Sequence, residues 1–406
     1  MQISFIIPTR NNLKYLRWAY NAIRDNQGEH IVELCVADDA STDGTWEWCQ
    51  DRMVNDTHFK AIRNEGPERL GHTILYDKLV NEVATNDICM IYHADMYLCP
   101  GALDDIEKYV DKKTIVSLTR IEPPLHPDGP EKVLADWGVE PEQFNERAFL
   151  QWFTSPEADG YKPKHKWPTA GIFAPWAFYK SDFQEIGGHD PLYAPQSKED
   201  SDIFNRFMLN GVNFVQTWQG CVYHMTCRGS RFNPTLTTPG TNSKEWEEQN
   251  QKSTKNFIRK WGSFVKHDAM MQPIVPHKYN IAFVVNNSDI QSLQVLEPWC
   301  DRLYLDNDMD SDVIHYIESE QHNTKFDLTK RIFMQRNNEP YAENDIVVEF
   351  DLRKFSQLSF NTIQELPVLL AQIPEPGVYE LDIFKITVNL IEPLENTLIK
   401  IQTQYN

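Results

Sequence analysis

The run from Ile88 to Ala94 is mostly apolar and ends abruptly in an acid, Asp95, a few residues before Pro100 and Gly101. This pattern is typical of a buried strand that carries a carboxylate to the open edge of a sheet. Ligands of open α/β sheets bind in the crevice beyond the carboxyl ends of the strands, so an acid there is well placed to hold a metal ion. The alternative is a helix N-cap, because Pro100 and Gly101 introduce a helix just downstream. The pattern therefore predicts a metal ligand or a helix cap at Asp95.

Strand and helix patterns alternate in the part of the chain before this stretch. The segment Ile3–Pro8 is a short apolar strand, after which apolar residues recur at helical spacing. A second strand over Ile31–Ala37 ends in Asp38 and Asp39 and is followed by a second helix. This order predicts a parallel sheet flanked by helices. One of the two adjacent acids can accept hydrogen bonds from a nucleobase or a ribose, and a capped loop is the alternative.

Composition narrows the class of protein. The chain has 406 residues, of which 41% are hydrophobic, which is enough for two or three domains with their own cores. A formal net charge of −20 argues against a nucleic-acid or anionic-membrane partner, because such partners need clustered Lys and Arg. The 7 cysteines are scattered without a Cys-x-x-Cys pair, which favours a reducing compartment without structural zinc. The sequence shows no signal peptide and no apolar run of about 18 residues, so we expect a cytoplasmic protein without a transmembrane segment.

Phosphate binding has no glycine-rich motif to support it. The chain contains neither the fingerprint of dinucleotide-binding sites nor a P-loop. Any phosphate that the protein binds must therefore be held by other means.

Four segments, taken in chain order, resemble the successive motifs of family 2 glycosyltransferases with the GT-A fold. They are Phe5-Ile6-Ile7-Pro8-Thr9-Arg10-Asn11, Asp38-Asp39-Ala40-Ser41-Thr42-Asp43-Gly44-Thr45, Asn64-Glu65-Gly66 and His93-Ala94-Asp95. The resemblance covers about residues 1 to 235. It implies a GT-A-like, mostly parallel α/β sheet with a site for a nucleotide sugar.

The predicted donor site combines residues of these motifs with nearby arginines. Its residues are Pro8, Thr9, Arg10, Asp38, Asp39, Arg63, His93, Ala94 and Arg228. The resemblance implies that the turn at Pro8 and Thr9 holds the nucleobase and ribose together with Asp39. Arg63 and Arg228 are candidates for contact with the diphosphate, and a solvated surface charge is the alternative for Arg63.

The predicted metal site has one departure from the family pattern. Asp95 stands at the last acid of the D-x-D metal motif, but His93 occupies the first position. A histidine there can hydrogen-bond ribose or phosphate, or ligate a transition metal. His224, at the end of a later strand, resembles the third metal ligand of the family. Mn²⁺ or Mg²⁺ suits this set of ligands, and imidazole favours Mn²⁺.

The predicted catalytic residues lie in the segment Glu199-Asp200-Ser201-Asp202, which with Arg206 resembles the family's E-D-x-D-x-x-x-R motif. The match implies that Asp200 is the general base, with Glu199 as its neighbour at the site. A positioned carboxylate is what the chemistry needs, because the acceptor hydroxyl must lose its proton as it attacks the sugar. The alternative is a helix N-terminus enriched in acids by the helix dipole.

The remaining sequence predicts two further parts. Residues 121–168 are rich in proline and tryptophan and form an insertion, whose aromatic residues either stack on sugars or pack on the sheet. We expect a glycosyltransferase domain over residues 1–270, a linker over 271–277 and a smaller, acidic α/β domain over 278–406. That last domain carries no motif that we recognise. Structural support, oligomerisation and acceptor recruitment all remain open as its role.

The sequence therefore predicts an inverting, metal-dependent glycosyltransferase. We expect it to move a sugar from a nucleoside-diphosphate sugar, with UDP as the favoured nucleotide, to a hydroxyl of a glycan or another acceptor. One alternative is a non-catalytic nucleotide- or glycan-binding module in which His93 marks a degenerate metal site. The other is a nucleotidyltransferase, which the lack of a glycine-rich, basic phosphate loop disfavours.

Overall fold

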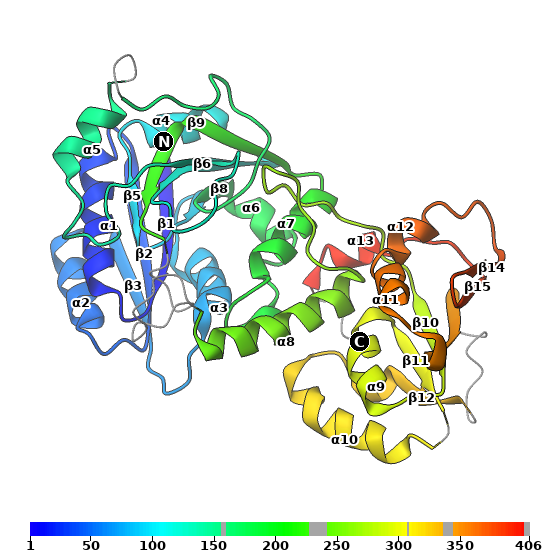
Figure 1. Cartoon of the computed structure of the whole chain (residues 1–406). Helices are drawn as coiled ribbons and strands as arrows, with labels where there is room; N and C mark the ends of the chain where they lie inside the picture. The colour runs from blue at the N-terminus through cyan, green and yellow to red at the C-terminus, as the bar shows by residue number, and fades with distance from the viewer. Residues whose placement is uncertain (156–159, 227–241, 307, 336–343, 402–406) are drawn as a thin grey trace. The chain divides into compact units, whose positions relative to one another are not determined.

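The computed structural model describes residues 1–155, 160–226, 242–306, 308–335 and 344–401 (Figure 1). The chain forms two compact units. The first contains Met1–Gln249 and His267–Pro273, and the second contains Asn250–Lys266 and Ile274–Asn406. The division falls within helix α8 (Lys244–Trp261), and the segment 271–277, predicted as a linker, contributes residues to both units.

A mixed sheet forms the centre of the first unit. Its strands are β1 (Gln2–Thr9), β2 (Ile31–Asp39), β3 (Phe59–Asn64), β4 (Ile88–Ile91), β5 (Met96–Leu98), β6 (Thr114–Glu122), β7 (Lys132–Leu134), β8 (Trp176–Tyr179) and β9 (Asn213–His224). Among the described residues the strand order is β3-β2-β1-β4-β8-β6-β9-β5, with β7 beside β6. Strands β3, β2, β1 and β4 run parallel, whereas β8 is antiparallel to both β4 and β6.

Helices connect these strands and lie on both sides of the sheet (Figure 1). They are α1 (Leu13–Asn26), α2 (Thr45–Asn55), α3 (Gly71–Lys78) continued by a π-helical turn (Leu79–Val83), α4 (Ala102–Tyr109), α5 (Glu146–Phe153), α6 (Lys180–Glu185), a 3₁₀ turn (Pro191–Tyr193) and α7 (Glu199–Leu209). The chain moves outward from β1 to β3 and then returns past β1 to β4. Because such crossovers are right-handed, the return helix α3 packs on the opposite face from α1 and α2. No helix in the described part of the chain combines the length and apolar character needed to cross a bilayer.

The end of β4 places Asp95 in the connection to β5. Strand β5 pairs with β9 so that Met96 lies opposite His224. The backbone N–H of Met225 donates to the carbonyl oxygen of Asp95, at 3.1 Å, which extends the pairing by one step. Helix α4 begins after Gly101, which is its N-cap, so Asp95 is not a helix cap here.

An apolar run just after the insertion does not form a strand. The segment Thr169–Pro175 is irregular, and its described contact with the sheet is a single bridge from Thr169 to Gln216. The strand that follows, β8, begins only at Trp176, because the prolines and the glycine at 171 interrupt the apolar run. In the second unit, residues 378–386 lie within a hairpin that turns at Asp382, whose φ is 52°.

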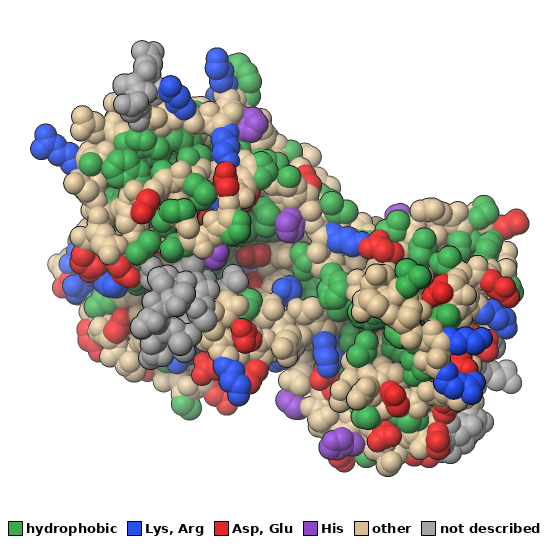
Figure 2. Space-filling model, viewed as in Figure 1, with side chains coloured by type: hydrophobic (Ala, Val, Ile, Leu, Met, Phe, Trp, Pro, Cys, Tyr) green, Lys and Arg blue, Asp and Glu red, His purple; other side chains and the backbone are tan. Residues whose placement is uncertain are grey.

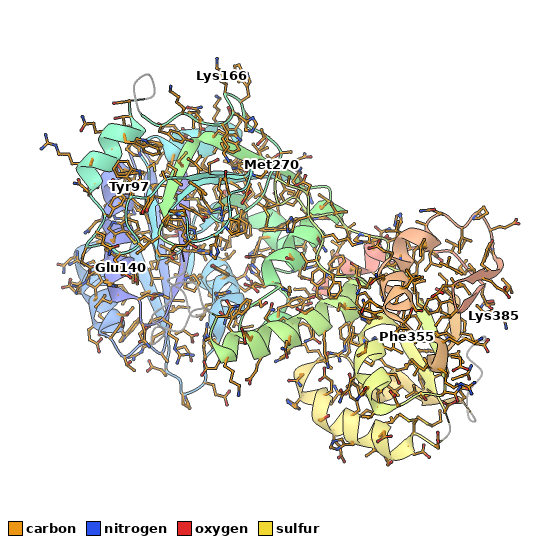
Figure 3. The ribbon with its side chains drawn as sticks, in the orientation of Figure 1. Tyr97, Glu140, Lys166, Met270, Phe355 and Lys385 are labelled. Atoms are coloured by element: carbon orange, nitrogen blue, oxygen red, sulfur yellow. The ribbon has the colours of Figure 1, made fainter. Side chains whose placement is uncertain are left out.

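The insertion over residues 121–168 includes the end of β6, strand β7 and helix α5. Trp137 and Trp152 pack against a buried aromatic cluster around Phe149. Tyr97, labelled in Figure 3, belongs to this cluster, and its hydroxyl donates to Glu146 at 2.7 Å. These two tryptophans therefore pack the insertion onto the first unit.

The second unit is a smaller α/β structure. Its strands are β10 (Ile281–Asn286), β11 (Arg302–Leu305), β12 (Ile332–Met334), β13 (Ile346–Asp351), β14 (Gly377–Leu381) and β15 (Phe384–Val388). Its helices are α9 (Ile290–Leu296), α10 (Asp310–Glu320), α11 (Gln357–Gln364), α12 (Leu366–Leu370) and α13 (Glu395–Leu398), with 3₁₀ turns at Glu297–Trp299, Gln321–Asn323, Leu328–Lys330 and Leu352–Lys354. The order among described strands is β12-β11-β10-β13-β15-β14, and the first four are parallel.

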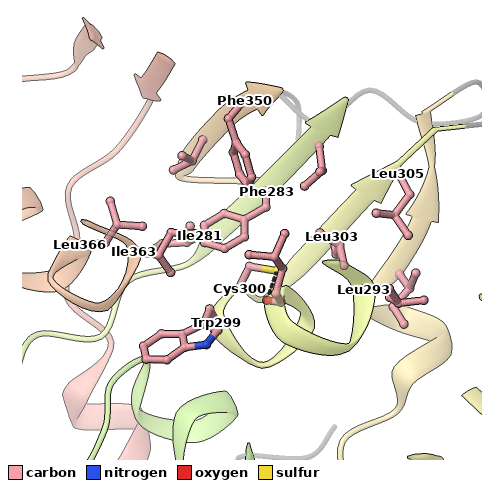
Figure 4. Close-up of a cluster of buried hydrophobic side chains, with 14 of the residues drawn as sticks. Ile281, Phe283, Leu293, Trp299, Cys300, Leu303, Leu305, Phe350, Ile363 and Leu366 are labelled. Atoms are coloured by element: carbon pink, nitrogen blue, oxygen red, sulfur yellow. Dashed lines mark hydrogen bonds between the residues drawn. The ribbon is translucent and has the colours of Figure 1, made fainter. Parts of the chain in front are cut away.

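An aromatic and aliphatic core holds this second sheet to its helices. Phe283 and Phe350 pack edge to face, with ring centroids 5.7 Å apart, and Trp299 closes one end of the cluster (Figure 4). On the face shown in Figure 2, acidic and basic side chains are interspersed over this unit. The expected fold class, a GT-A-like, mostly parallel α/β sheet with a second, smaller α/β unit, is confirmed.

A buried ion network supports the second unit. Glu297 accepts hydrogen bonds from the guanidinium groups of Arg259 (2.6 Å) and Arg331 (2.8 Å) and from the hydroxyl of Tyr316 (3.1 Å). The side chains of Arg259 and Glu297 are both 0% exposed. Burial opposes ionisation of Glu297, but the two arginines outweigh it and lower the pKa of its carboxyl to about 2.

We expect Glu297→Gln to lower the free energy of unfolding of this unit by about 3–5 kcal/mol, because the buried guanidinium groups of Arg259 and Arg331 would lose the carboxylate that they share, and Arg259 would keep its pair with Glu320. Urea unfolding of the full chain, with hydrogen exchange of the β10 amides as the local report, measures the change. Lys330→Ala is the matched control, because Lys330 is 71% exposed and its ion pair with Asp327 contributes below about 1 kcal/mol. Equal effects of the two substitutions would contradict the prediction.

Candidate functional site

A cavity of about 510 Å³ opens at the carboxyl ends of the strands in the first unit. It is lined by residues from the loops after β1, β2, β4 and β6 and from α3, α7 and the end of β9: Pro8, Thr9, Arg10, Asn12, Asp39, Arg69, Gly71, His72, Leu75, Tyr76, His93, Ala94, Asp95, Arg120, Glu122, His126, Lys132, Phe173, Gln196, Ser197, Glu199, Asp200, His224, Thr226 and Trp246. This is the edge of an open α/β sheet at which ligands bind.

Most of the residues predicted from the sequence line this cavity. From the predicted donor set they are Pro8, Thr9, Arg10, Asp39, His93 and Ala94. The predicted metal ligands, Asp95 and His224, and the predicted catalytic pair, Glu199 and Asp200, line it as well. Asp38 and Arg63 do not line it, and Arg228 lies outside the described residues.

Asp38 and Arg63 pair with each other behind the cavity. The Arg63 Nε atom lies 3.4 Å from Asp38 Oδ2, and the side chain of Asp38 is fully buried. Asp38 Oδ1 also accepts a hydrogen bond from the Ser41 backbone N–H, at 3.2 Å. Burial raises the pKa of Asp38 despite these contacts. The pair therefore holds the loop after β2 in place.

Asp39 caps helix α3 from the end of β2. Its carboxylate accepts hydrogen bonds from the backbone N–H groups of Leu70 (3.0 Å) and Gly71 (2.9 Å). Gly71 has a φ of +74°, and a Cβ added there would lie 2.2 Å from the carbonyl oxygen of Pro195. Arg69 Nε is 3.7 Å from Asp39 Oδ2. The acid thus brings the Arg69 loop close to the loop that precedes α7.

The hydroxyl of Thr9 is a free polar atom in this part of the cavity. Thr9 Oγ1 is buried and has no hydrogen-bond partner among the described residues. A buried hydroxyl without a partner costs free energy, which a ligand that donates to or accepts from it would recover. Thr9 and Asp39 together therefore form a polar corner suited to a nucleoside.

Three side chains in the cavity can hold a metal ion: His93, Asp95 and His224. One ligand atom from each lies within 4.8 Å of the others. His224 Nε2 is 3.5 Å from Asp95 Oδ1, and the imidazole rings of His93 and His224 have centroids 5.9 Å apart. Two imidazoles and a carboxylate are donors that suit a first-row divalent cation, so the residues present fit the metal that the family implies.

Electrostatics favours a cation at this place. Burial opposes protonation of His224, but Asp95 and Glu122 outweigh it and raise the pKa of this imidazole to about 9. Burial likewise opposes ionisation of Asp95, whose pKa His224 nevertheless lowers. Burial lowers the pKa of His93 to about 4 despite the nearby charge of Asp95, so His93 is a neutral donor at pH 7. Two carboxylates around one histidine create a negative field that a divalent ion would neutralise.

The predicted base lies at the start of α7, across the cavity. Glu199 Oε1 is 2.7 Å from His72 Nε2, and Glu199 Oε2 is buried without a hydrogen-bond partner among the described residues. Burial opposes ionisation of Glu199, but the contact with His72 lowers its pKa. Burial and the neighbouring charge of Glu199 then raise the pKa of Asp200 to about 6. Asp200 is therefore ionised at pH 7 and can still accept a proton.

Sequence reasoning missed several residues of the cavity. They are His72, Arg120, Glu122 and Lys132, with His126, Phe173 and Trp246 at the rim. The sequence did contain a signal for Glu122. The charged residues Arg120 and Glu122 stand at the end of a strand, just as acids stand at or shortly after the ends of β2 and β4. His72 and Lys132 carry no comparable local pattern, since their roles depend on partners in other segments.

Comparisons with known proteins agree with the motifs. The model of the family "Glycosyl transferase family 2" matches residues 4–169. Abequosyltransferase RfbV of Salmonella typhimurium is 33% identical over 119 residues, which are 29% of this chain and 35% of RfbV. This chain thus spans about a third of the length of that curated relative.

Two solved structures are similar at low identity. One is TarS of S. aureus in complex with UDP-GlcNAc, with 14% identity, 64% of this chain and 66% of that chain covered, and a TM-score of 0.38. The other is the mannosyltransferase PcManGT of Pyrobaculum calidifontis in complex with GDP-Man and Mn²⁺, with 16% identity, 56% and 57% covered, and a TM-score of 0.39. The family match covers the segments that carry Pro8, Asp39 and Asp95 at the cavity. Over residues 4–169, this chain is thus similar to glycosyl transferase family 2.

Proposed function

We propose that the first unit is an inverting glycosyltransferase that moves a sugar from a UDP-sugar to a hydroxyl group of a glycan or another acceptor. One observation carries this proposal: a single cavity is lined by the nucleotide-site motif residues, by the His93, Asp95 and His224 group and by the acidic start of α7. Each of these three parts has a different task in sugar transfer. Their convergence favours an enzyme over a module that only binds.

The nucleoside would lie at the corner formed by the loop after β1 and Asp39. Thr9 offers its free hydroxyl there, and Pro8 precedes it at the end of β1. Arg10 and Arg69 both line the cavity. They would offset the charge of the diphosphate, which the protein has no glycine-rich loop to hold.

The diphosphate would meet a divalent ion held by Asp95 and His224, with His93 as the third donor. The ion would supply Lewis-acid stabilisation of the departing nucleoside diphosphate. Asp95 and His224 hold this position because β5 and β9 pair directly beside them. Mn²⁺ or Mg²⁺ fits the donor set, and the two imidazoles favour Mn²⁺.

Asp200 would take the proton of the acceptor hydroxyl. A carboxylate with a pKa of about 6 is ionised at neutral pH and is a stronger base than an ordinary aspartate. Direct attack by the activated hydroxyl on the anomeric carbon displaces the diphosphate from the opposite face, which inverts the configuration. Glu199, paired with His72, acts beside Asp200 by keeping a negative charge next to it.

Donor binding is the first test. We expect UDP at a hundred times its dissociation constant to raise the free energy of unfolding by about 2.7 kcal/mol, and to do so at a lower UDP concentration when Mn²⁺ is present. Thermal melts of the full chain with UDP, GDP and ADP measure this. Melting curves that no nucleoside diphosphate moves, with or without metal, would refute nucleotide-sugar binding.

The proposed base, Asp200, and the proposed metal ligands, Asp95 and His224, have different tasks, and this difference gives a second prediction. Asp200→Asn should leave UDP affinity nearly unchanged and lower sugar transfer by ~10²–10⁴, the usual contribution of a general base. Asp95→Asn and His224→Ala should instead weaken both metal-dependent UDP binding and turnover, because a metal ligand serves the bound donor and the departing diphosphate. Calorimetry and transfer assays on the three variants compare binding with chemistry. Unchanged turnover of Asp200→Asn on a verified acceptor would remove the base assignment.

The pH profile of transfer gives a third prediction. Since Asp200 must be ionised and its pKa is raised to about 6, kcat should fall as the pH drops through about 6 and level off above it. Glu199→Gln removes the neighbouring negative charge, so the acid limb should move to lower pH while part of the shift caused by burial remains. Glu131→Gln, which changes an acid of the insertion without contact to α7, is the control. An acid limb that stays in place in Glu199→Gln would contradict the coupling.

A further inference from the structure

We propose that Glu122, together with Arg120 and Lys132, is a positioning group that fixes the imidazole of His224 for metal binding. This inference rests on the proposed function, because it requires the metal site at Asp95 and His224. None of the three residues belongs to a motif that pointed to the site. Glu122 ends strand β6, and Lys132 begins strand β7.

The contact between Glu122 and His224 is direct and buried. Glu122 Oε1 lies 2.8 Å from His224 Nδ1, and the side chain of Glu122 is 2% exposed. Strands β6 and β9 run side by side with Ile121 opposite Tyr223, so the next residue on each strand brings the two side chains together. Strand pairing therefore sets the relative position of these two side chains, without any dependence on the conformation of a loop.

This contact determines which ring nitrogen of His224 faces the cavity. When Nδ1 donates its hydrogen to Glu122, the lone pair of the neutral imidazole is on Nε2. Nε2 is the atom that lies 3.5 Å from Asp95 Oδ1, within the group of possible metal ligands. Metal-bound histidines generally hold their second nitrogen in this way, and the partner sets the orientation and basicity of the ring.

Two cations hold Glu122 in turn. Arg120 Nη1 is 3.0 Å from Glu122 Oε1, and Lys132 Nζ is 3.2 Å from Glu122 Oε2. Each carboxylate oxygen therefore has its own positive partner. A carboxylate that is fixed at both of its oxygen atoms leaves the imidazole of His224 little rotational freedom.

A purely structural role is the competing explanation. On that view Glu122 only neutralises Arg120 and Lys132, and its loss would lower stability without a selective effect on the metal. Glu131 provides a matched comparison, because it also pairs with Arg120, at 3.3 Å, yet within the described part of the chain it neither contacts His224 nor lines the cavity. Glu122 and Glu131 thus both pair with Arg120, and they differ in the contact with His224, which Glu122 makes.

The test is a Mn²⁺ titration of the full-length protein without nucleotide, followed by electron paramagnetic resonance of free Mn²⁺. We expect Glu122→Gln to weaken Mn²⁺ binding by about 10–100-fold, the usual effect of losing such a partner, and Glu131→Gln to leave it within about 3-fold. Glu122→Asp is the second variant, because it keeps the charge for Arg120 and Lys132 but withdraws the carboxylate from Nδ1. It should retain the fold, as judged by its melting temperature, and still bind Mn²⁺ more weakly than the wild type.

The outcomes separate this inference from the proposed function. If the wild type binds Mn²⁺ and folded Glu122→Asp and Glu122→Gln proteins bind it equally well, Glu122 does not position the ligand and the inference is overturned. If Glu131→Gln weakens binding as much as Glu122→Gln does, the effect comes from the shared cation, and the inference is again overturned. If the wild type binds no Mn²⁺ while UDP still stabilises the fold, the metal site itself is wrong, although donor binding stands.

Discussion

The pairing of strand β9 with two neighbours is the constraint on which the site depends. Strand β6 lies along one edge of β9 and β5 along the other, so the last residue of β9, His224, is flanked by the end of β6 and the start of β5. Glu122 and Asp95 occupy those two places. Backbone pairing of the three strands therefore places the imidazole of His224 between the carboxylates of Asp95 and Glu122. The side chains need only short rotations to come into contact. A site built on paired strands is held more firmly than one built on free loops.

Charge compensation explains how so many ionisable groups can be buried around one cavity. Asp95 and Glu122 flank His224, and Arg120 and Lys132 pair with Glu122. Negatively and positively charged side chains therefore alternate across this group. A buried charge without a partner costs several kcal/mol, and this alternation avoids that cost. The start of α7 follows a different rule, because Glu199 is paired with His72 at 2.7 Å, and its charge, together with burial, raises the pKa of the neighbouring Asp200. The base proposed at Asp200 must be able to take up a proton, which a tightly paired carboxylate cannot do as readily.

The sequence allowed the α/β fold and most of the candidate cavity to be predicted, for identifiable reasons. Apolar runs that end in acids marked Asp39 and Asp95, and the family motifs placed Asp200 and His224 in the same crevice. The same rule, an acid at the end of a strand, would have identified Glu122. The prolines downstream instead led us to interpret its segment as an insertion. Pairwise contacts such as that of His72 with Glu199 join residues 127 apart, and no local pattern predicts them. The run Thr169–Pro175 is irregular although it is mostly apolar, because Gly171 and Pro175 interrupt it.

Asp39 and Asp95 raised the same ambiguity in the sequence, and the structure resolves them differently. Asp95 does not cap helix α4, which begins after Gly101, and its side chain lines the cavity. Asp39 does cap a helix, because it accepts hydrogen bonds from the backbone of Leu70 and Gly71, yet it also lines the cavity. A carboxylate has about four lone-pair sites, so holding the start of α3 does not exhaust its capacity to accept. The cap fixes the Arg69 loop beside the polar corner formed by Thr9 and Asp39, so the shape of that corner depends on the folding of helix α3.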